Sequence, residues 1–396
     1  MRILFLGGSY FQVPPLLYAR EKGYYVIVFD YLLDNPGQKY ADAYYPVSTT
    51  DVAGVLQLAC KLNIDGIVAY ASDPAASTAA YVAQELNLPG NPFSAVQILS
   101  RKDLYRAFLR KHHFHAPLAA SFSELQETED YLKTALMPVM IKPVDASGSK
   151  GVSKIDSLDQ FEGAFMKALQ FSRAKKVIIE TYIKRKGFQI AGDGLVIDGK
   201  LAFACLGQEH FKNSQENFTP VGESFPLQLS RHLQDKIHNE IERLLSLLNM
   251  KMGALNFDII LSEQDDVYLM EVGPRAGGNL ISEVVKYSTG VNLVEYIVDG
   301  ALGLPLKGIQ KSEREICFSS YILHANKDGF FKGVEFHSTL TSNIFKTLLF
   351  VKTGMPVKRF ENSSGSIGCV MLRFGSPDEM LEKMQTIGDR IQVQVE

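Results

Sequence analysis

Two short apolar segments around residue 260, each with one acidic side chain, limit what this 396-residue chain can fold into. Residues 254–261 and 267–272 are expected to be strands, because both are mostly apolar and a polar turn separates them. A hairpin would bring Asp258 of the first strand and Glu271 of the second to one face. Neighbouring buried carboxylates repel each other unless a cation lies between them, and Mg²⁺ with nucleotide phosphates is the usual solution. A hairpin with two acids at its solvated ends is the alternative.

The first hundred residues alternate strand-like and helix-like segments, which predicts a parallel sheet flanked by helices. Strands are expected at residues 3–6, 25–30 and 66–70, and helices at 13–22, 52–62 and 75–86. The turn after the first strand, at Gly7 and Gly8, lacks the G-x-G-x-x-G spacing, so a nicotinamide oxidoreductase is not expected. Ser9 and the pair Ser72 and Asp73 follow strand ends, where they could bind a ligand or simply cap turns.

Composition and charge exclude several classes of protein. The chain is 46% hydrophobic and 21% charged with a net charge of −3, which indicates neither nucleic-acid nor membrane-surface binding. No apolar run exceeds strand length, so no membrane span is expected. The histidines at 112, 113 and 115 have no acidic or sulfur ligand at metal spacing. The four cysteines lack CxxC spacing and are expected to be reduced core thiols in the cytoplasm: Cys60, Cys205, Cys317 and Cys369.

A lysine and a loop of small residues follow one another in the middle of the chain. Residues 139–142 are expected to be a strand that ends in Lys142, and the loop 145–152 comes next. Gly148 and Gly151 would let backbone N–H groups wrap an oligophosphate while Lys142 supplies a point charge. The spacing is not G-x-x-x-x-G-K-[ST], which excludes a P-loop fold, and a flexible surface hairpin is the alternative.

Further segments complete the pattern. The basic segment 100–112 is expected to be a helix with a solvated basic face. His210 and Lys212, just past a predicted strand, could point together toward a phosphate or carboxylate. Residues 229–248 form a predicted amphipathic helix that leads into the acidic hairpin. A last small α/β unit is expected after residue 303, with strands near 316–324 and 368–374 and a helix at 377–387.

In this order, the segments of residues 1–305 resemble the ATP-grasp superfamily, in particular its branch of biotin carboxylase, carbamoyl-phosphate synthetase, purine-pathway ligases and L-amino-acid ligases. The resemblance implies an α/β ATP-grasp fold with a Rossmann-like N-terminal domain built on a parallel sheet and a small C-terminal α/β lobe. The implied domains are the N-terminal domain at 1–112, the ATP-grasp domain at 113–305, with a lid at about 113–183 and a C-lobe at about 184–305, and the C-terminal lobe at 306–396.

The resemblance also implies a role for each matching residue. The ATP phosphates would be bound by Lys102, Lys142 and the loop residues Ser147, Gly148, Ser149, Gly151 and Val152. The adenine and ribose would be bound by Glu180, Thr181, Tyr182, Ile183 and Gln189. Mg²⁺ would be bound by Asp258 and Glu271, and the catalytic groups would be Arg275, which steadies the phosphorylated intermediate, with His210 and Lys212.

Two positions depart from the family pattern. Gln189 stands where the family often has a ribose-binding Glu, although an amide can still hydrogen-bond a hydroxyl. Gly273 stands two residues after Glu271, where the family commonly has Asn, so a second Mg²⁺ would need Asn279 or water as a ligand. The sequence Glu-Val-Gly-Pro-Arg-Ala-Gly-Gly at 271–278 looks most like the amino-acid-ligase side of the family.

The resemblance implies an ATP-dependent ligase that joins a small-molecule carboxylate to an amine through an acyl phosphate, with release of ADP and phosphate. ATP and one or two Mg²⁺ ions would be the cofactors, with Mn²⁺ able to substitute. The protein would be cytoplasmic, would bind neither nucleic acid nor a membrane, and would be similar to relatives that are often homodimers. Two alternatives stay open: a bicarbonate-using carboxylase or carbamoyl-phosphate-synthetase-like enzyme, and an ATP-binding module that has lost catalysis.

Overall fold

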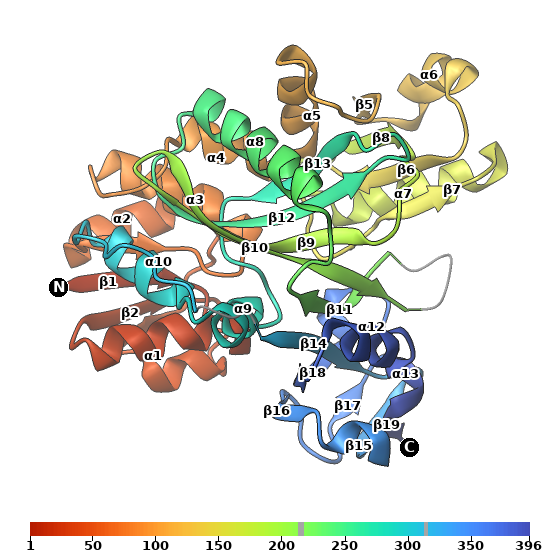
Figure 1. Ribbon diagram of the computed structural model, residues 1–396. Helices are drawn as coiled ribbons and strands as arrows, with labels where there is room; N and C mark the ends of the chain where they lie inside the picture. The colour runs from red at the N-terminus through yellow and green to blue at the C-terminus, as the bar shows by residue number, and fades with distance from the viewer. Residues whose placement is uncertain (213–217, 313–315) are drawn as a thin grey trace.

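The computed structural model describes residues 1–212, 218–312 and 316–396, and it places the start of the chain in a parallel sheet (Figure 1). The strand order is β3-β2-β1-β4 and every pairing is parallel, as the alternating pattern predicts. The short strand β3 is not apparent from the sequence, because three residues are too few to show a period. This part contains β1 (Arg2–Leu6), α1 (Val13–Glu21), β2 (Tyr25–Phe29), β3 (Ala43–Tyr45), α2 (Val52–Leu62), β4 (Gly66–Val68), α3 (Asp73–Glu85), α4 (Phe93–Ser100) and α5 (Lys102–Lys111).

Residues 119–181, which we call the lid, form an antiparallel sheet with helix α7 packed against it (Figure 1). The strand order is β5-β8-β6-β7, so β5 and β7 are edge strands. Phe161 and Phe165 of α7 share a hydrophobic core with Val139 and Ile141 of β6, because the helix turns its apolar stripe toward the sheet. The lid contains β5 (Ala119–Phe122), α6 (Glu129–Thr134), β6 (Val139–Pro143), β7 (Ser153–Ile155), α7 (Phe161–Phe171) and β8 (Val177–Thr181).

An eight-stranded antiparallel sheet in the order β13-β12-β9-β10-β11-β14-β18-β16 forms the centre of the molecule. Because β11 pairs with β14, strands from both sides of residue 305 belong to one sheet. The predicted division at residue 305 is therefore crossed by continuous backbone pairing. The strands are β9 (Gln189–Ile197), β10 (Lys200–Phe211), β11 (Pro220–Phe225), β12 (Gly253–Leu261), β13 (Val267–Gly273), β14 (Cys317–His324), β16 (Ile344–Leu349) and β18 (Ser366–Phe374).

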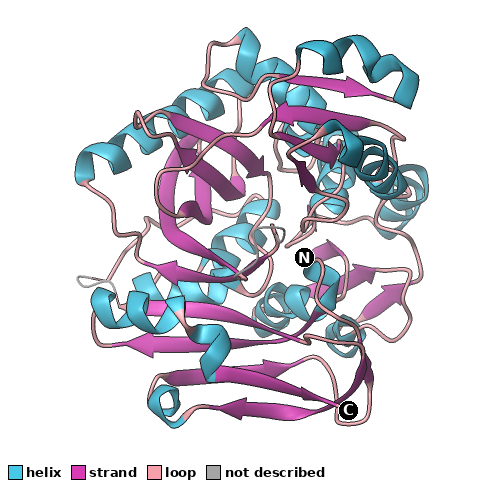
Figure 2. Ribbon diagram, turned by 90° about the vertical axis from the view of Figure 1, so that its right-hand side faces the viewer, coloured by secondary structure: helices cyan, strands magenta, loops and turns pink. Residues whose placement is uncertain are grey.

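A small three-stranded sheet in the order β17-β15-β19 lies beside the C-terminal end of the central sheet. Figure 2 shows the C-terminal strands running side by side across the lower part of the molecule, next to the C-terminus. Phe331 of β15 and Met380 of α12 share a hydrophobic core with Tyr321 of β14, which holds the two sheets together. This part adds β15 (Gly329–Phe336), α11 (Ser338–Thr341), β17 (Pro356–Val357), α12 (Pro377–Gln385), α13 (Ile387–Arg390) and β19 (Ile391–Val395).

Three helices, α8 (Arg231–Leu248), α9 (Ile281–Thr289) and α10 (Leu293–Ala301), fix the central sheet to its surroundings. The apolar face of α8 is buried with Leu255 and Phe257 of β12, as the amphipathic pattern predicts. Helix α10 packs against α1, and one core contains both Leu16 and Ile297. This shared core sets the ends of the N-terminal strands beside the acidic hairpin.

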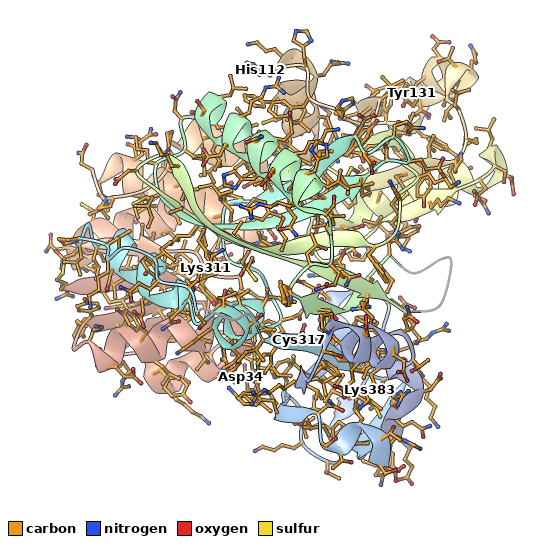
Figure 3. All side chains as sticks on the ribbon, viewed as in Figure 1. Asp34, His112, Tyr131, Lys311, Cys317 and Lys383 are labelled. Atoms are coloured by element: carbon orange, nitrogen blue, oxygen red, sulfur yellow. The ribbon has the colours of Figure 1, made fainter. Side chains whose placement is uncertain are left out.

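The cysteines and the helices test two further expectations. Cys205, Cys317 (labelled in Figure 3) and Cys369 are buried, as expected. Cys60 is exposed, so its predicted core position is wrong: Ala59 takes the inward position on α2 and Cys60 faces solvent. Among the described residues, no helix is both long and apolar enough to cross a membrane.

Candidate functional site

The N-terminal sheet, the lid, the central sheet and the C-terminal lobe all contribute residues to one cleft of about 540 Å³. Ser9 and Asp73 line it from the N-terminal side, and Ser363 and Ser364 line it from the C-terminal lobe. Most of the predicted site residues line this cleft: Lys102, Lys142, Ser147, Gly148, Ser149, Val152, Thr181, Tyr182, Ile183, Gln189, Asp258, Glu271 and Arg275. Gly151, Glu180, His210 and Lys212 are not among its lining residues.

The acidic hairpin has the predicted register. Asp258 of β12 and Glu271 of β13 are direct cross-strand partners, so both carboxylates face the cleft from adjacent strands. Burial, followed by the neighbouring Glu271 carboxylate, raises the pKa of Asp258 to about 7. Lys102 Nζ lies 3.1 Å from Glu271 Oε2. A carboxylate pair that repels in this way fits a bound divalent cation.

The metal ligands that the protein can supply are few. Within the described residues, no group of three or more His, Cys, Asp or Glu side chains is arranged to hold a metal ion. A cation between Asp258 and Glu271 would therefore complete its coordination with ligand phosphates or water, as Mg²⁺ commonly does. Asn279 lines the same cleft, whereas Gly273 has no side chain to contribute.

Lys142 and Arg106 share one buried carboxylate. Lys142 Nζ lies 2.8 Å from Glu180 Oε2, and Arg106 Nε lies 2.9 Å from Glu180 Oε1. Burial alone would raise the pKa of Glu180, but Arg106 and Lys142 outweigh it and lower the pKa to about 2. The Glu180 side chain therefore holds two cations in place, and Glu180 itself does not line the cleft.

Arg106 was not among the predicted site residues. The basic run on α5 indicates a solvated face, and that interpretation is wrong for Arg106, whose side chain is 4% exposed. Its Nη1 donates to the backbone oxygen of Met270, which ties α5 to β13. A basic residue that the helical period places beside the buried Tyr105 and Leu109 is the sequence signal for such an inward position.

The glycine-rich loop is closed over the cleft. Lys102 Nζ donates to the backbone oxygen of Ala146 (2.9 Å), and Ser149 Oγ donates to that of Phe218 (2.9 Å). The backbone oxygen of Gly148 accepts from Ser363 N (3.2 Å), so the loop tip contacts the C-terminal lobe. Gly148 has φ +68°, and a Cβ there would lie 2.0 Å from Ser363 Oγ, so both the backbone conformation and the contact require glycine.

Arg275 is held by the N-terminal part of the chain. Its Nε and Nη2 donate to the two carboxylate oxygens of Asp73, at 2.8 and 2.7 Å. Burial would raise the pKa of Asp73, but the Arg275 guanidinium outweighs it and lowers that pKa. The loop behind Arg275 is fixed by Asp193, which is fully buried and accepts from Gly277 N and Ser282 Oγ. The bidentate pair aims the guanidinium at the cleft.

Two acids that line the cleft, Glu209 and Glu223, were not predicted. They are cross-strand partners on β10 and β11. Gln189 Nε2 donates to Glu209 Oε2 (2.7 Å), so the predicted ribose-binding amide contacts an acid. Burial and neighbouring carboxylates raise the pKa of both acids well above the usual range. Both acids lie outside the strands expected from the sequence, since β10 extends to Phe211 and β11 (Pro220–Phe225) was not predicted, so the signal that identified Asp258 was missing for them.

His210 and Lys212 lie away from the cleft lining. Because side chains alternate along β10, Glu209 faces the cleft and His210 faces the opposite side of the sheet. His210 Nε2 shares a hydrogen bond with Ser224 Oγ (2.6 Å), and burial lowers the pKa of His210 to about 4. Lys212 Nζ donates to Asn326 Oδ1 (2.6 Å). This arrangement does not support the catalytic role predicted for the two residues.

The comparisons with known proteins agree with this architecture. Residues 135–284 match the family model described as the ATP-grasp domain. The carbamoyl phosphate synthase large chain of Thermoanaerobacter pseudethanolicus is 24% identical over 311 residues, which are 76% of this chain and 28% of that protein. The D-alanine–D-alanine ligase of Parabacteroides distasonis is 24% identical over 224 residues, which are 53% of this chain and 66% of the ligase.

Two solved structures share the fold over the whole chain. The L-amino acid ligase from Bacillus licheniformis superposes with a TM-score of 0.86 at 21% identity, covering 100% of this chain and 98% of its own. Phosphoribosylglycinamide synthetase from Anaerococcus prevotii superposes with a TM-score of 0.77 at 21% identity, covering 100% of this chain and 99% of the synthetase chain. The fold is therefore that of the ATP-grasp enzymes. Residues 135–284 are similar to the ATP-grasp domain, and the predicted fold class is confirmed.

Proposed function

We propose that the protein is an ATP-dependent ligase that joins a carboxylate to an amine, with an acyl phosphate as intermediate and with release of ADP and phosphate. One observation carries the proposal: a single cleft brings together the acid pair Asp258 and Glu271, the cations Lys102 and Lys142, and Arg275. The chain covers only 28% of the carbamoyl phosphate synthase large chain that it matches, so the activity is inferred from this cleft and from the shared fold.

In this proposal the substrate carboxylate attacks the γ-phosphorus of ATP, the bond to the ADP oxygen breaks, and the amine then displaces phosphate from the acyl carbon. Phosphoryl transfer needs positioning and charge neutralisation more than covalent help. Lys102 and Lys142 supply positive charge beside the phosphates, and Arg275 stabilises the charge that develops on the transferred group. Their carboxylate partners fix these cations before the substrate arrives, which avoids reorganisation during the reaction.

Asp258 and Glu271 are the residues that would hold Mg²⁺, with Mn²⁺ able to substitute. The metal supplies charge neutralisation and alignment of the ATP phosphates. The raised pKa of Asp258 supports this assignment, because a cation would relieve the repulsion that raises it. A structure of the biotin carboxylase domain of a Hydrogenobacter thermophilus enzyme, which shares this fold at 13% identity, contains MgADP.

The closed loop supports the chemistry of a reactive intermediate. An acyl phosphate is hydrolysed when water reaches it, so the site must exclude water during the reaction. The loop tip at Gly148 contacts Ser363 of the C-terminal lobe, and Ser149 bonds to Phe218. For nucleotide to enter, these contacts must open, and they reform over the bound substrates.

The partners in this proposal are a small-molecule carboxylate and a small-molecule amine, in a cytoplasmic homodimer. The biotin carboxylase domain that shares the fold was solved as a dimer, which supports the dimeric part of the proposal. Light scattering on the eluting peak of a size-exclusion column measures the mass directly. A mass of 44.0 kDa, that of one chain, would contradict a dimer.

The experiment that tests the proposal measures ADP and phosphate release from pure protein with Mg·ATP and pooled carboxylates, with and without pooled amines. Release that requires both pools is the expected result. AMP in place of ADP would mean an adenylate intermediate and would overturn the mechanism. ADP formation that requires only bicarbonate would favour the carboxylating alternative, and ATP binding without turnover in every pool would favour the non-catalytic module.

A further inference from the structure

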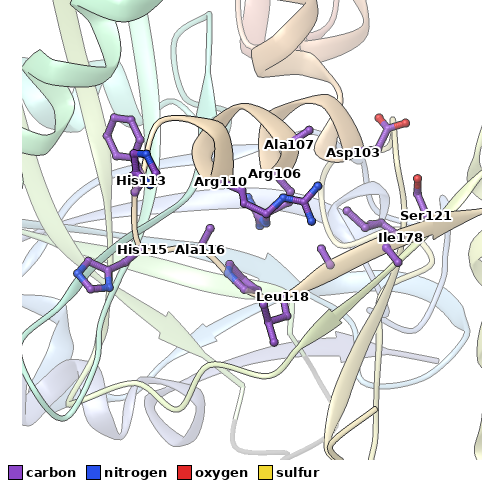
Figure 4. Close-up of a pocket in the computed structure, with 14 residues that line it drawn as sticks. Asp103, Arg106, Ala107, Arg110, His113, His115, Ala116, Leu118, Ser121 and Ile178 are labelled. Atoms are coloured by element: carbon purple, nitrogen blue, oxygen red, sulfur yellow. The ribbon is translucent and has the colours of Figure 1, made fainter. Parts of the chain in front are cut away.

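A second cavity, of about 650 Å³, lies outside the cleft, between α5 and the edge strand β5 of the lid (Figure 4). Its polar lining is mostly basic, with Arg106 and Arg110 from α5 and His113 and His115 from the segment that follows. Of the described residues, Arg106 is the one that lines both cavities. The volume is in the range of cavities that bind small molecules.

Positive charge exceeds negative charge around this outer cavity. Asp103 is the one acidic residue in its lining, and it already pairs with Arg101 at 2.7 Å and Lys176 at 3.4 Å. The Arg110 guanidinium makes no hydrogen bond or ion pair with another residue in the described part of the chain. Figure 4 shows Arg106 and Arg110 close together below α5, on the cavity side of the helix.

Arg106 is only partly neutralised by its own partner. Its buried side chain pairs with Glu180, but the same carboxylate also binds Lys142 Nζ at 2.8 Å. Two cations thus share one anion, and this buried group of three keeps a net positive charge. Unbalanced buried charge is unfavourable, so an anion on the outer side of Arg106 would be stabilised there.

We propose that the outer cavity binds a phosphate-bearing small molecule and that this binding weakens nucleotide binding in the cleft through Arg106, Glu180 and Lys142. Arg110 presents a planar pair of donors, which matches the geometry of phosphate oxygens. Arg106 adds Nη2, the guanidinium nitrogen that pairs with neither Glu180 nor Met270. The apolar wall formed by Pro117, Leu118 and Ile178 suits an uncharged part of the same ligand.

The coupling follows from the shared carboxylate. An anion that engages Arg106 leaves Glu180 to pair more strongly with Lys142, so the phosphates of ATP meet a weaker positive field. Thermodynamic linkage requires the reverse effect to have the same size, so nucleotide should weaken phosphate binding equally. The coupling rests on the proposed nucleotide role of the cleft, whereas the binding of phosphate to the outer cavity does not.

Isothermal titration calorimetry on the full-length protein tests both parts. The first titration measures binding of Mg²⁺ with a non-hydrolysable ATP analogue, so failure of the proposed nucleotide role is seen by itself. The second titrates inorganic phosphate at constant ionic strength into wild type, Arg110→Ala and Lys111→Ala. Lys111 is the matched control, since it is the next residue of α5, is exposed and does not line the cavity.

We expect one phosphate site whose affinity falls about tenfold in Arg110→Ala, the loss of one charge-assisted contact, and changes less than about twofold in Lys111→Ala. Absence of phosphate binding, or equal weakening in both variants, would overturn the site, because a solvated basic helix face responds to either change. Acetate that binds as tightly as phosphate would overturn the phosphate class. If phosphate leaves the affinity for the ATP analogue unchanged, the proposed coupling is overturned.

Discussion

The cleft has a basic wall and an acidic wall, and the two differ in how far the protein itself pairs their charged side chains. The basic wall consists of Lys102, Lys142 and Arg275, and each of these cations already has a carboxylate partner, as Arg275 has Asp73 at 2.7 Å. The acidic wall lies on the central sheet and consists of Glu209, Glu223, Asp258 and Glu271, and burial raises the pKa of the first three. Each cation of the basic wall is thus paired within the protein, although Lys142 shares Glu180 with Arg106, whereas the acidic wall needs a further cation to be stable in its charged form.

The difference shows which charges the protein holds in place in advance and which charges a bound ligand must neutralise. Fixed cations can stabilise developing charge without moving, which is the most effective form of electrostatic catalysis. Carboxylates that repel one another instead raise the free energy of the site, and a divalent ion that binds between them removes this repulsion. Variants that change one wall at a time therefore separate the effects of the two walls on activity and stability.

The largest effect is expected when the acidic wall loses half of its proposed metal pair. Glu271→Ala leaves Asp258 without its cross-strand partner, so Mg²⁺-dependent ADP release should be abolished while the fold stays intact. The measurement is ADP release across a Mg²⁺ titration, with urea unfolding as the check on folding. Glu263→Ala, an exposed acid in the turn of the same hairpin, is the control and should leave activity unchanged. A folded Glu271→Ala protein with normal turnover at the same Mg²⁺ concentration would remove Glu271 from the metal site.

The next largest effect is expected on stability, when the basic wall loses its shared anion. Glu180→Ala leaves Arg106 and Lys142 buried without a partner, and this should lower the free energy of unfolding by about 3–5 kcal/mol. Removing Glu263 from its exposed pair with Lys184, whose 2.7 Å distance is similar, should leave the free energy of unfolding nearly unchanged, because water screens an exposed pair. Urea unfolding at neutral pH measures both variants. Equal losses would mean that burial does not distinguish the two pairs.

The same carboxylate also predicts a pH dependence. The pKa of Glu180 is about 2 in the folded protein and 4.5 for the free side chain, so its stabilising contribution is complete above about pH 4.5. That contribution should be lost as the pH falls from 4.5 toward 2, because the unfolded chain then binds a proton that the folded protein does not. Acid unfolding of wild type should therefore be steeper in this window than that of Glu180→Gln. Parallel curves would contradict the strong pairing of Glu180.

Arg275 tests whether the prearranged charge of the basic wall acts in catalysis. Arg275→Ala should reduce kcat by about 10²–10³, or about 3–4 kcal/mol, as expected for one preorganised electrostatic partner. The measurement is the rate of ADP release under conditions in which chemistry limits turnover. Arg231→Ala, an exposed arginine at the start of α8 that does not line the cleft, serves as the control. Wild-type kcat in Arg275→Ala would exclude the guanidinium from the mechanism.

The smallest effect is expected from protonation of the acidic wall. Because the pKa of Asp258 is about 7 in the folded protein and 3.8 for the free side chain, the folded state keeps a proton that the unfolded state loses between about pH 4 and 7. Stability from this group therefore falls as the pH rises through that window. Mg²⁺ needs the ionised form, so its apparent affinity should be about tenfold weaker at pH 6 than at saturation, or about 1.4 kcal/mol.

Thermal unfolding with and without Mg²⁺ at pH 6 and pH 8 measures this effect. The rise in Tm caused by Mg²⁺ should be larger at pH 8, and the difference between the two pH values should disappear in Asp258→Asn. The same rise at both pH values in wild type would mean that Asp258 does not titrate at the metal site.

The parts of this protein that local periodicity encodes can be predicted from its amino-acid sequence. The acidic hairpin is predictable because its two strands are joined by a short turn, and alternation of side chains fixes which faces Asp258 and Glu271 share. The parallel N-terminal sheet follows from alternating strand and helix patterns. The glycine-rich loop is visible in the sequence because Gly148 and Gly151 stand among small residues, and glycine is the residue that adopts their positive φ most easily.

Contacts between side chains that are far apart in the sequence depend instead on how the elements pack together. Arg275 and Asp73 are 202 residues apart, and no local period can specify that pair. The inward position of Arg106 and the buried position of His210 on the sheet face away from the cleft depend on which face of α5 and of β10 other elements cover. The pairing of β11 with β14, which carries the C-terminal lobe onto the central sheet, is likewise a long-range contact. Periodicity tells which side chains share a face, but packing between elements decides what that face meets.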